Sequence, residues 1–283
     1  MILPRARRSS RAARPGTGAG TMPAVTAMRA APLRNLQRAA GLALLLLVLA
    51  WALRGTEFEP ERLSGGLARA WEGLSAMFPP RWSELPRALE ALVVTVQMAL
   101  LGTFIGLTGA LPVSFVAART GVVPMPVSVL VKACLNVLRA IPPHVYAILF
   151  VYIAGLGPFT GALGIGVGAF AFMAKLFAES LESVHPAPVE AVRACGGNRA
   201  QVFAYGMLPQ ALPQFLSHTL YAWEQSISAA TVVGIVGAGG IGHLMIQQIR
   251  YYEWQKASVY ILVVVLMVLV ADAASYRIRR RFT

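Results

Sequence analysis

The glycine-rich run G-A-G-G-I-G, residues 237–242, has the spacing of a cofactor-binding motif. Gly237, Gly239 and Gly242 fit the pattern G-x-G-x-x-G, whose glycines let a backbone approach the pyrophosphate of a dinucleotide. No strand–helix–strand pattern surrounds the run, and the next acid follows too closely to bind a ribose. We therefore interpret these residues, Gly240 included, as a tightly packed irregular turn that can also act as a gate.

Glu224 is an ionisable residue near the middle of an apolar stretch at residues 211–234. Such a residue within a membrane-spanning segment indicates a functional site by default. A bare carboxylate would repel an anionic substrate, so a structural hydrogen bond or a pairing with an arginine such as Arg139 is an equally good explanation. The sequence leaves both roles of Glu224 open.

Motifs of known enzyme classes are missing from the sequence. It has no G-x-x-x-x-G-K-[ST] nucleotide loop, no nucleophile elbow and no paired-acid signature. Histidines such as His144, His185 and His243 are scattered without metal-ligand spacing, and Cys134 and Cys195 are too far apart for a metal or redox motif. We therefore expect no catalytic residue, no metal site and no cofactor in this chain.

Apolar residues dominate the composition and indicate the fold class. Hydrophobic residues make up 57% of the 283 residues and charged residues only 13%, well below the roughly 25% typical of soluble domains. The net charge is +13, and the arginines lie at the ends of apolar segments, as the positive-inside rule expects. The sequence thus predicts an all-α integral membrane protein in a lipid bilayer, with no nucleic acid as partner.

Six apolar segments predict about six transmembrane helices. They lie at residues 39–53, 91–116, 144–155, 159–177, 211–234 and 257–274. Glycines three or four residues apart in the second and fourth segments predict close helix–helix packing. Residues 123–139 form an amphipathic helix that either lies at the inner surface or begins the third span. Arginine-rich tails at both ends predict that both termini are cytoplasmic.

The chain divides by composition into four regions. Residues 1–38 are a basic cytoplasmic tail that we expect to be disordered, with an organelle transit peptide or a later translation start as alternatives. Residues 39–88 hold the first helix, for which a signal peptide is the rival interpretation, and a periplasmic loop. Residues 89–276 form the core, and residues 277–283 are a second basic cytoplasmic tail.

A polar interruption at residues 190–209 separates the apolar segments and has the pattern of two short helices joined by a hinge. Pro188 and Glu190 suit the first turn of the first helix, where a missing N–H costs nothing and a negative charge meets the helix dipole. Gly196 and Gly197 suit its end, because glycine adopts the left-handed conformation without strain.

The second helix of the interruption is predicted by a capping box. Asn198 can cap its N-terminus, and Gln201 follows three residues later. Pro209 is expected to close the unit. Counted from the N-terminus, this loop, residues 185–209, falls on the cytoplasmic side.

The interruption resembles the E-A-A loop of ABC-importer membrane subunits, whose pattern is E-A-A-x3-G-x9-I-x-L-P. The residues in register are Glu190, Ala191, Gly196, Leu208 and Pro209. Val192 replaces the second alanine, and Gly206 replaces the isoleucine, a departure that is itself typical of phosphonate permeases. The flanks, A-K-L-F-A-E-S-L-E before the loop and S-A-A-T-V-V-G-I-V-G-A-G-G-I-G-H-L after it, also resemble permeases of phosphonate uptake systems. The resemblance covers about residues 85–276.

The resemblance implies the type I ABC importer permease fold in a bacterial inner membrane. Two permease copies would form one path for phosphonate, fed by a periplasmic binding protein and driven by a cytoplasmic ABC ATPase dimer that holds ATP and Mg. The residues expected to contact the ATPase are Glu190, Ala191, Arg193, Gly196, Gly197, Leu208 and Pro209. The residues assigned to a translocation path or gate are Arg139, Glu224, Ser228, Thr231, Gly237, Gly239, Gly240 and Gly242.

Other functions stay open at this point. The same fold could import phosphite, phosphate or methionine. A secondary transporter or channel would need no ATPase, but the sequence lacks the internal repeat that many such proteins show. A membrane-embedded enzyme is a more distant alternative.

Overall fold

The computed structural model describes residues 24–56, 60–120 and 123–282, and every regular element in these ranges is a helix. The chain divides into two compact units, residues 1–68 and 69–283. Helix α1 (Ala24–Gly55) lies in the first unit, and α2 (Pro60–Ala76) continues from it into the second. Residues 1–23, most of the predicted basic tail, lie outside the described residues.

Two predictions about the N-terminal third are wrong. The disordered tail was expected to reach residue 38, but α1 already begins at Ala24. The start of α1 is rich in alanine, leucine and arginine, which favour helices. The helix therefore extends beyond the apolar segment on its N-terminal side. The loop expected up to residue 88 is largely helical, since it contains α2, the short 3₁₀ helix η1 (Trp82–Glu84) and the start of α3.

Three helices of the second unit are long and apolar enough to cross a membrane. They are α3 (Leu85–Ala117), α6 (Pro158–Glu182) and α11 (Trp254–Phe282). Glycines bring α3 and α6 together: a Cβ at Gly106 would lie 2.8 Å from the Cβ of Ala169, and one at Gly102 would lie 2.8 Å from Ile165. The predicted close packing through small residues is therefore confirmed.

Two further helix pairs are each long enough for one span but are bent. Helix α4 (Met125–Ala140) meets α5 (Pro143–Ala154) at 83°, at the Pro142–Pro143 step. The second pair joins residues 199–238 to α10 (Gly240–Arg250) at 60°. The described residues thus contain three to five candidate spans and one shorter apolar helix, Ala40–Gly55. Together these helices include the six apolar segments that the sequence predicts.

Helix α10 follows the glycine turn and was not predicted from the sequence. It follows α9 (Leu208–Val233) after a π-helical segment, η3 (Gly234–Ala238). Its apolar face places Ile241 in a cluster with Ala88 of α3 and Tyr260 of α11. The glycines before it end one helix, but the apolar face after them is sufficient to start another.

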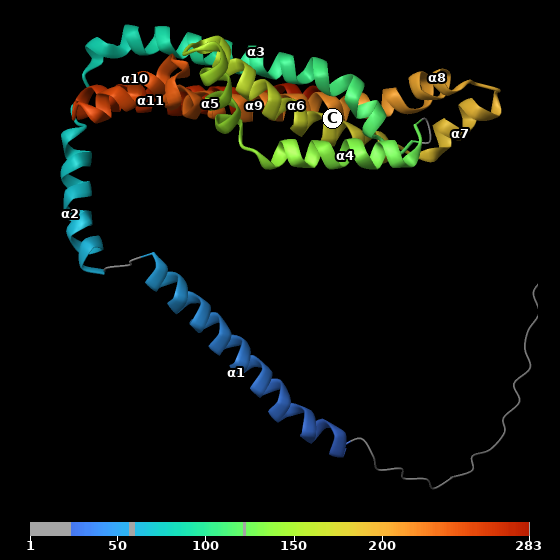
Figure 1. Cartoon of the computed structure of the whole chain (residues 1–283), viewed down its shortest axis with the longest axis horizontal. Coiled ribbons are helices and arrows are strands. Elements are labelled where there is room, and N and C mark those ends of the chain that lie inside the picture. Colours follow the sequence, from blue (N-terminus) through green and yellow to red (C-terminus); the bar gives the residue numbers. More distant parts are fainter. Residues whose placement is uncertain (1–23, 57–59, 121–122, 283) are drawn as a thin grey trace, which may run out of the picture. The chain divides into compact units, whose positions relative to one another are not determined.

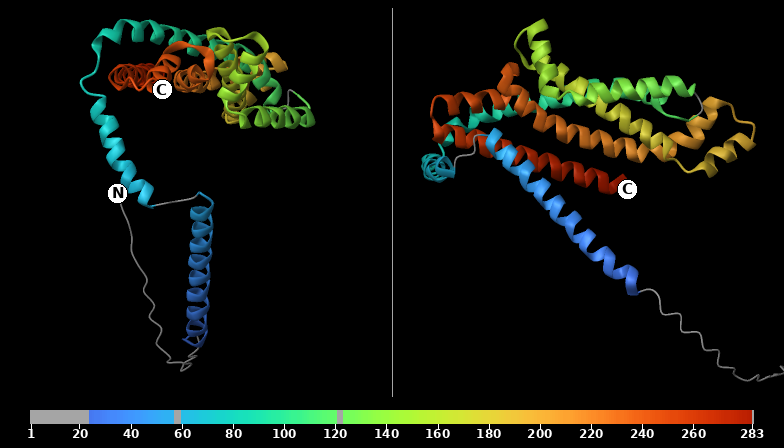
Figure 2. Two further views of the ribbon diagram at one scale, coloured as in Figure 1. Left: turned by 60° about the vertical axis from the view of Figure 1, so that its left-hand side comes forward. Right: turned by 60° about the horizontal axis from the view of Figure 1, so that its bottom comes forward.

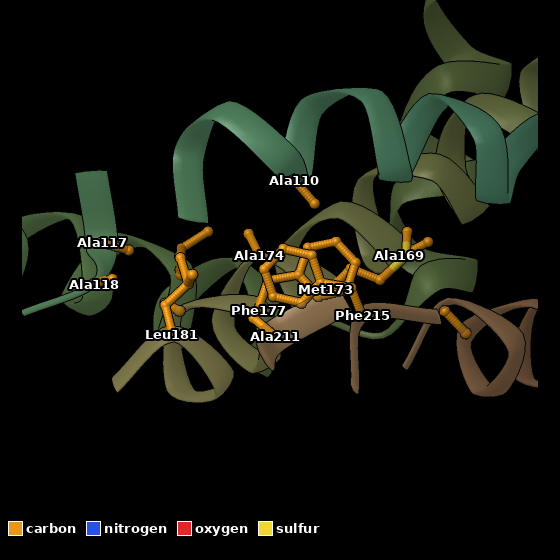
Figure 3. Close-up of a cluster of buried hydrophobic side chains, with 13 residues drawn as sticks. Ala110, Ala117, Ala118, Ala169, Met173, Ala174, Phe177, Leu181, Ala211 and Phe215 are labelled. Carbon is orange, nitrogen blue, oxygen red and sulfur yellow. The ribbon is translucent and has the colours of Figure 1, made fainter. Parts of the chain in front are cut away.

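The main core lies between α3, α6 and α9 (Figure 3). The rings of Phe177 and Phe215 stack with their centroids 4.3 Å apart, and alanines fill the space around them. A second cluster joins Met98, Ile165 and Ile227 of the same three helices. These contacts make α3, α6 and α9 the rigid centre of the unit.

The polar interruption and α10 lie at opposite ends of this unit (Figures 1 and 2). Helices α7 (Pro186–Ala194) and α8 (Arg199–Gln201) project beyond the ends of α3 and α6, whereas α10 lies near the start of α3. Helix α9 runs from one end to the other. A displacement of the projecting unit is therefore passed to the far end by one helix.

Candidate functional site

The first helix of the projecting unit, α7, begins at Pro186 with His185 as its cap. The Nδ1 atom of His185 accepts a hydrogen bond of 3.2 Å from the N–H of Ala187. Pro188 lies in the first turn, as predicted, but Glu190 is the fifth residue of the helix and lies beyond it. The prediction for Glu190 was wrong because the helix starts two residues before Pro188.

The end of α7 has the predicted glycine geometry. Gly196 adopts a φ of +79°, which an L-residue with a side chain rarely adopts. The N–H of Gly197 donates to the carbonyl of Val192 (3.0 Å), and that of Gly196 donates to the carbonyl of Arg193 (2.9 Å). These two bonds form a Schellman motif, which satisfies the last carbonyls of the helix and fixes the direction of the chain beyond it.

The predicted capping box is also present. The Asn198 Oδ1 atom accepts a 2.9 Å bond from the N–H of Gln201, and the Gln201 Oε1 atom accepts a 2.8 Å bond from the N–H of Asn198. The turn between the helices is therefore held by paired hydrogen bonds at both sides. It is a fixed corner rather than a loose hinge.

The helix after this corner is not a separate short helix. It continues from α8 through a π-helical segment, η2 (Val202–Met207), into α9. Pro209 lies at the start of α9 and does not close the unit, contrary to the prediction. Pro209 has no N–H to donate to the preceding turn, and the N–H of Leu208 donates instead to Phe203 in the wider π register.

Gly206 lies where η2 packs closely against α7. A Cβ on Gly206 would lie 3.1 Å from the Cα of Val189 in α7. The apolar centre of the unit is formed by Val189, Val202 and Met207, all buried. Gln210 adds polar contacts, since its Nε2 donates to the Gly206 carbonyl at 2.6 Å and its Oε1 accepts from the N–H of His185 at 3.0 Å. The two helices thus move as one body.

The tip of this unit is open to solvent. Five of the seven residues predicted to contact an ATPase are exposed, namely Glu190, Ala191, Arg193, Gly196 and Pro209. Gly197 and Leu208 are half-buried and support the corner and the start of α9. Sequence reasoning missed Tyr205, whose side chain is 72% exposed beside the tip. An exposed large aromatic is typical of interface hot spots.

A cavity of about 480 Å³ lies between α4, α5, α6 and α9. Of the predicted path residues it contains Arg139 and Ser228. The polar residues that sequence reasoning missed are His144, Tyr221, Gln225 and Ser226. Tyr221, Gln225 and Ser228 follow one another at spacings of four and three, so the helical period of exposed polar residues in an apolar span could have indicated them.

Glu224 pairs with an arginine, as one of the two interpretations expected, but the partner is Arg279 and not Arg139. The Oε1 atom of Glu224 accepts a 2.6 Å hydrogen bond from Nη2 of Arg279 in α11, and only 12% of the Glu224 side chain is exposed. The guanidinium of Arg139 lies instead over the ring of Phe172, 5.7 Å from its centroid. Thr231 is buried with its hydroxyl directed to Ile227, outside the lining of the cavity. Glu224 thus joins α9 to α11, and Thr231 lies outside the cavity.

The glycine turn is irregular and tightly packed, as predicted. Gly237, Gly239 and Gly240 have φ values of +107°, +85° and +71°. A Cβ at Gly242 would overlap the backbone of Thr231. Gly237 also lines a second cavity of about 480 Å³, together with His243, Gln247 and Arg250 of α10. The turn thus lies beside the second cavity, whose lining continues on both sides of it.

No metal-binding group was found among the described residues, which contain no cluster of three or more His, Cys, Asp or Glu side chains. The two cysteines are free and exposed.

Comparison with known proteins identifies the family. The family model for the binding-protein-dependent transport system inner membrane component matches residues 110–283. The chain belongs to this family. It is 37% identical over 234 residues to the putative phosphite transport system permease protein HtxC of Stutzerimonas stutzeri, covering 83% of this chain and 82% of HtxC. It is 39% identical to the putative cryptic phosphonate transport system permease protein PhnE2 of Escherichia coli (strain K12), over 39% of this chain and 90% of PhnE2.

A solved structure of the MetNI methionine ABC transporter in an inward-facing conformation has the same fold. The TM-score is 0.64 at 24% identity, over 72% of this chain and 99% of that chain. The chain is therefore a multi-pass permease of the binding-protein-dependent transport family with the type I ABC importer fold. The expected all-α membrane fold and transport function are confirmed.

Proposed function

We propose that this permease forms the membrane path of an ABC importer for phosphonate or a related phosphorus oxyanion such as phosphite. The rigid, doubly capped α7–α8 corner, which projects at one end of the bundle, is the observation that carries the proposal. The names of HtxC and PhnE2 support this substrate class. Phosphate and methionine are the alternatives within the same fold.

The projecting unit is proposed to bind a groove of a separate cytoplasmic ATPase dimer, which holds ATP and Mg. Glu190, Ala191, Arg193 and Gly196 offer an exposed polar and small-residue tip. Leu208 and Pro209 lie at the start of α9, the helix proposed to transmit the motion of the tip to the rest of the permease. Because η2 and α9 continue the same helix, rotation of the tip displaces α9 as a lever, and rigid-body motion gives alternating access.

The path itself is proposed to follow α9 between two copies of this permease. The glycine turn follows the first cavity along the chain and borders the second, so Gly237, Gly239, Gly240 and Gly242 form a candidate gate. A periplasmic binding protein would deliver the substrate at the α10 end. Both termini and the α7–α8 unit are then cytoplasmic, as the arginine-rich tails favour.

The test uses the complete complex of permease, ATPase and binding protein in liposomes. Glu190→Lys changes the exposed tip only, and Gly196→Asp also strains the end of α7, but neither enters the main core, so both variants should insert normally. We expect them to lose substrate-stimulated ATP hydrolysis and uptake together. Asp272→Asn, an exposed change on α11, serves as the control. Normal stimulated hydrolysis in both tip variants would disprove the coupling role.

A second measurement addresses the cargo and the class of transporter. Titration of the binding protein with phosphonate, phosphite, phosphate and methionine is expected to select a phosphorus oxyanion. Uptake by the permease alone, driven by an ion gradient, would instead identify a secondary transporter and overturn the proposal.

A further inference from the structure

Arg139 has an unusual environment for a charged residue in a membrane-spanning segment. It lies in the last turn of α4, at the 83° bend between two halves of one span. Its guanidinium is exposed to the 480 Å³ cavity and rests over the Phe172 ring. Among the residues that the structure describes, no carboxylate forms an ion pair with it. An arginine beside apolar helices without a counter-ion is costly, and in membrane proteins such residues mark ion or substrate pathways.

The α9 wall of the cavity carries polar groups within a lining that is mostly apolar. On α9, Tyr221, Gln225, Ser228 and Val232 follow one another at helical spacing, and each is exposed and lines the cavity. The amide of Gln225 and the hydroxyl of Ser228 can both donate hydrogen bonds. No acidic residue lines the cavity. The surroundings therefore offer one positive charge and several donors, but no group that repels an anion.

The outer end of the same helical face is apolar. Val232 is the last α9 residue in the cavity, and Ile235, three residues on, lines the second cavity beyond it. Their side chains are 46% and 36% exposed. Two such side chains, faced by their counterparts on a second copy, would close the path by excluding water. The cavity that contains Arg139 thus lies on one side of an apolar constriction.

On the basis of the proposed function, we propose that this cavity is a transient binding site for a tetrahedral phosphorus oxyanion that passes through the permease. This site is called the station below. Arg139 supplies the charge, Gln225 and Ser228 supply hydrogen bonds, and Val232 bounds the station on the outer side. Charge-assisted bonds from a guanidinium suit phosphorus oxyanions, since its fork of donors matches two oxygens at once. A zwitterion such as methionine would gain less from a station with no acidic residue.

The first test measures uptake of phosphite, phosphate and methylphosphonate by the complete complex in liposomes. Arg139→Gln should lower the uptake rate about tenfold to a hundredfold, the loss expected for a charge-assisted bond. Arg139→Lys should retain an intermediate rate. ATP hydrolysis stimulated by the binding protein should persist, because the coupling unit is unchanged. Arg280→Gln, an exposed change of the same kind outside the cavity, should behave like the wild type.

The second test detects occupancy of the cavity directly. In a background in which Cys134 and Cys195 are serine, a Ser228→Cys variant is labelled with a cationic methanethiosulfonate reagent. We expect millimolar inorganic phosphate to slow labelling, with chloride at equal ionic strength as the control. The protection should disappear when Arg139→Gln is added. Labelling that is slower in the native protein than in the denatured protein shows that each variant is folded.

A lipid headgroup carries the same phosphate chemistry, so the labelling is repeated with and without phosphatidylglycerol in the vesicles. Protection that follows phosphatidylglycerol instead of added phosphate would overturn the transport station. Wild-type uptake by Arg139→Gln together with unprotected Ser228→Cys would also overturn it, while leaving the importer function intact. Absence of phosphorus oxyanion uptake by the wild-type complex would instead reject the proposed function.

Discussion

Replacing Gly206 by isoleucine would restore the residue usual in the E-A-A pattern, yet we expect it to damage this permease. A Cβ at Gly206 would lie 3.1 Å from the Cα of Val189 and 3.4 Å from the carbonyl oxygen of Pro188, so the larger side chain has no room. It must push α7 away from η2 and open the centre formed by Val189, Val202 and Met207. Overpacking of this kind costs about 1–3 kcal/mol.

This loss should affect coupling more than folding, because the contact lies outside the main core around Phe177 and Phe215. The assay is the number of substrate molecules imported per ATP hydrolysed by the reconstituted complex, together with the apparent Tm of the purified permease. Gly206→Ala should give a smaller loss than Gly206→Ile, and Gly73→Ala, on a helix with open space around it, serves as the matched control. Wild-type coupling and Tm in Gly206→Ile would refute the argument that α7 and η2 move as one body.

Three further changes test separate parts of the structure. Glu224→Gln should lower stability by about 1–2 kcal/mol in denaturant unfolding, because it removes a charged partner of the partly exposed Arg279; an unchanged midpoint would show that the pair is unimportant. Gly242→Ala should reduce both stability and transport, since its Cβ overlaps the Thr231 backbone, and a fully active variant would contradict the close packing. Asn198→Ala should cost about 1 kcal/mol at the cap and speed hydrogen exchange of the Gln201 amide roughly fivefold; unchanged exchange would mean that the cap is weak.

Local signals in the sequence were enough to predict the elements that depend on neighbouring residues. The Gly196–Gly197 helix end and the Asn198–Gln201 capping box were predicted correctly because their hydrogen bonds join residues within a few positions. The small-residue face that joins α3 to α6 was predicted for the same reason, since helical spacing alone places the glycines in line.

Features that depend on residues far apart in the sequence could not be predicted from local sequence patterns. The partner of Glu224 is Arg279, and the choice between it and Arg139 requires the packing of α9 against α11. Likewise, α10 was not predicted, because its apolar residues follow a glycine-rich turn and are buried only by packing against α3 and α11. Pro209 was predicted to end the helical unit. The prediction failed because the π-helical hydrogen-bond register, which tolerates a missing N–H, has no clear sequence pattern.

The central claim is that the α7–α8 tip contacts the ATPase, and a natural cysteine allows a direct test. Cys195 is exposed at the end of α7, and Cys134→Ser leaves it as the only thiol in the chain. In the complete complex, a short thiol-to-amine cross-linker attached to Cys195 is expected to join the permease to the ATPase subunit, and less so in Gly196→Asp. A Cys195 that reacts only with the binding protein, or with an impermeant reagent from the periplasmic side, would contradict the account.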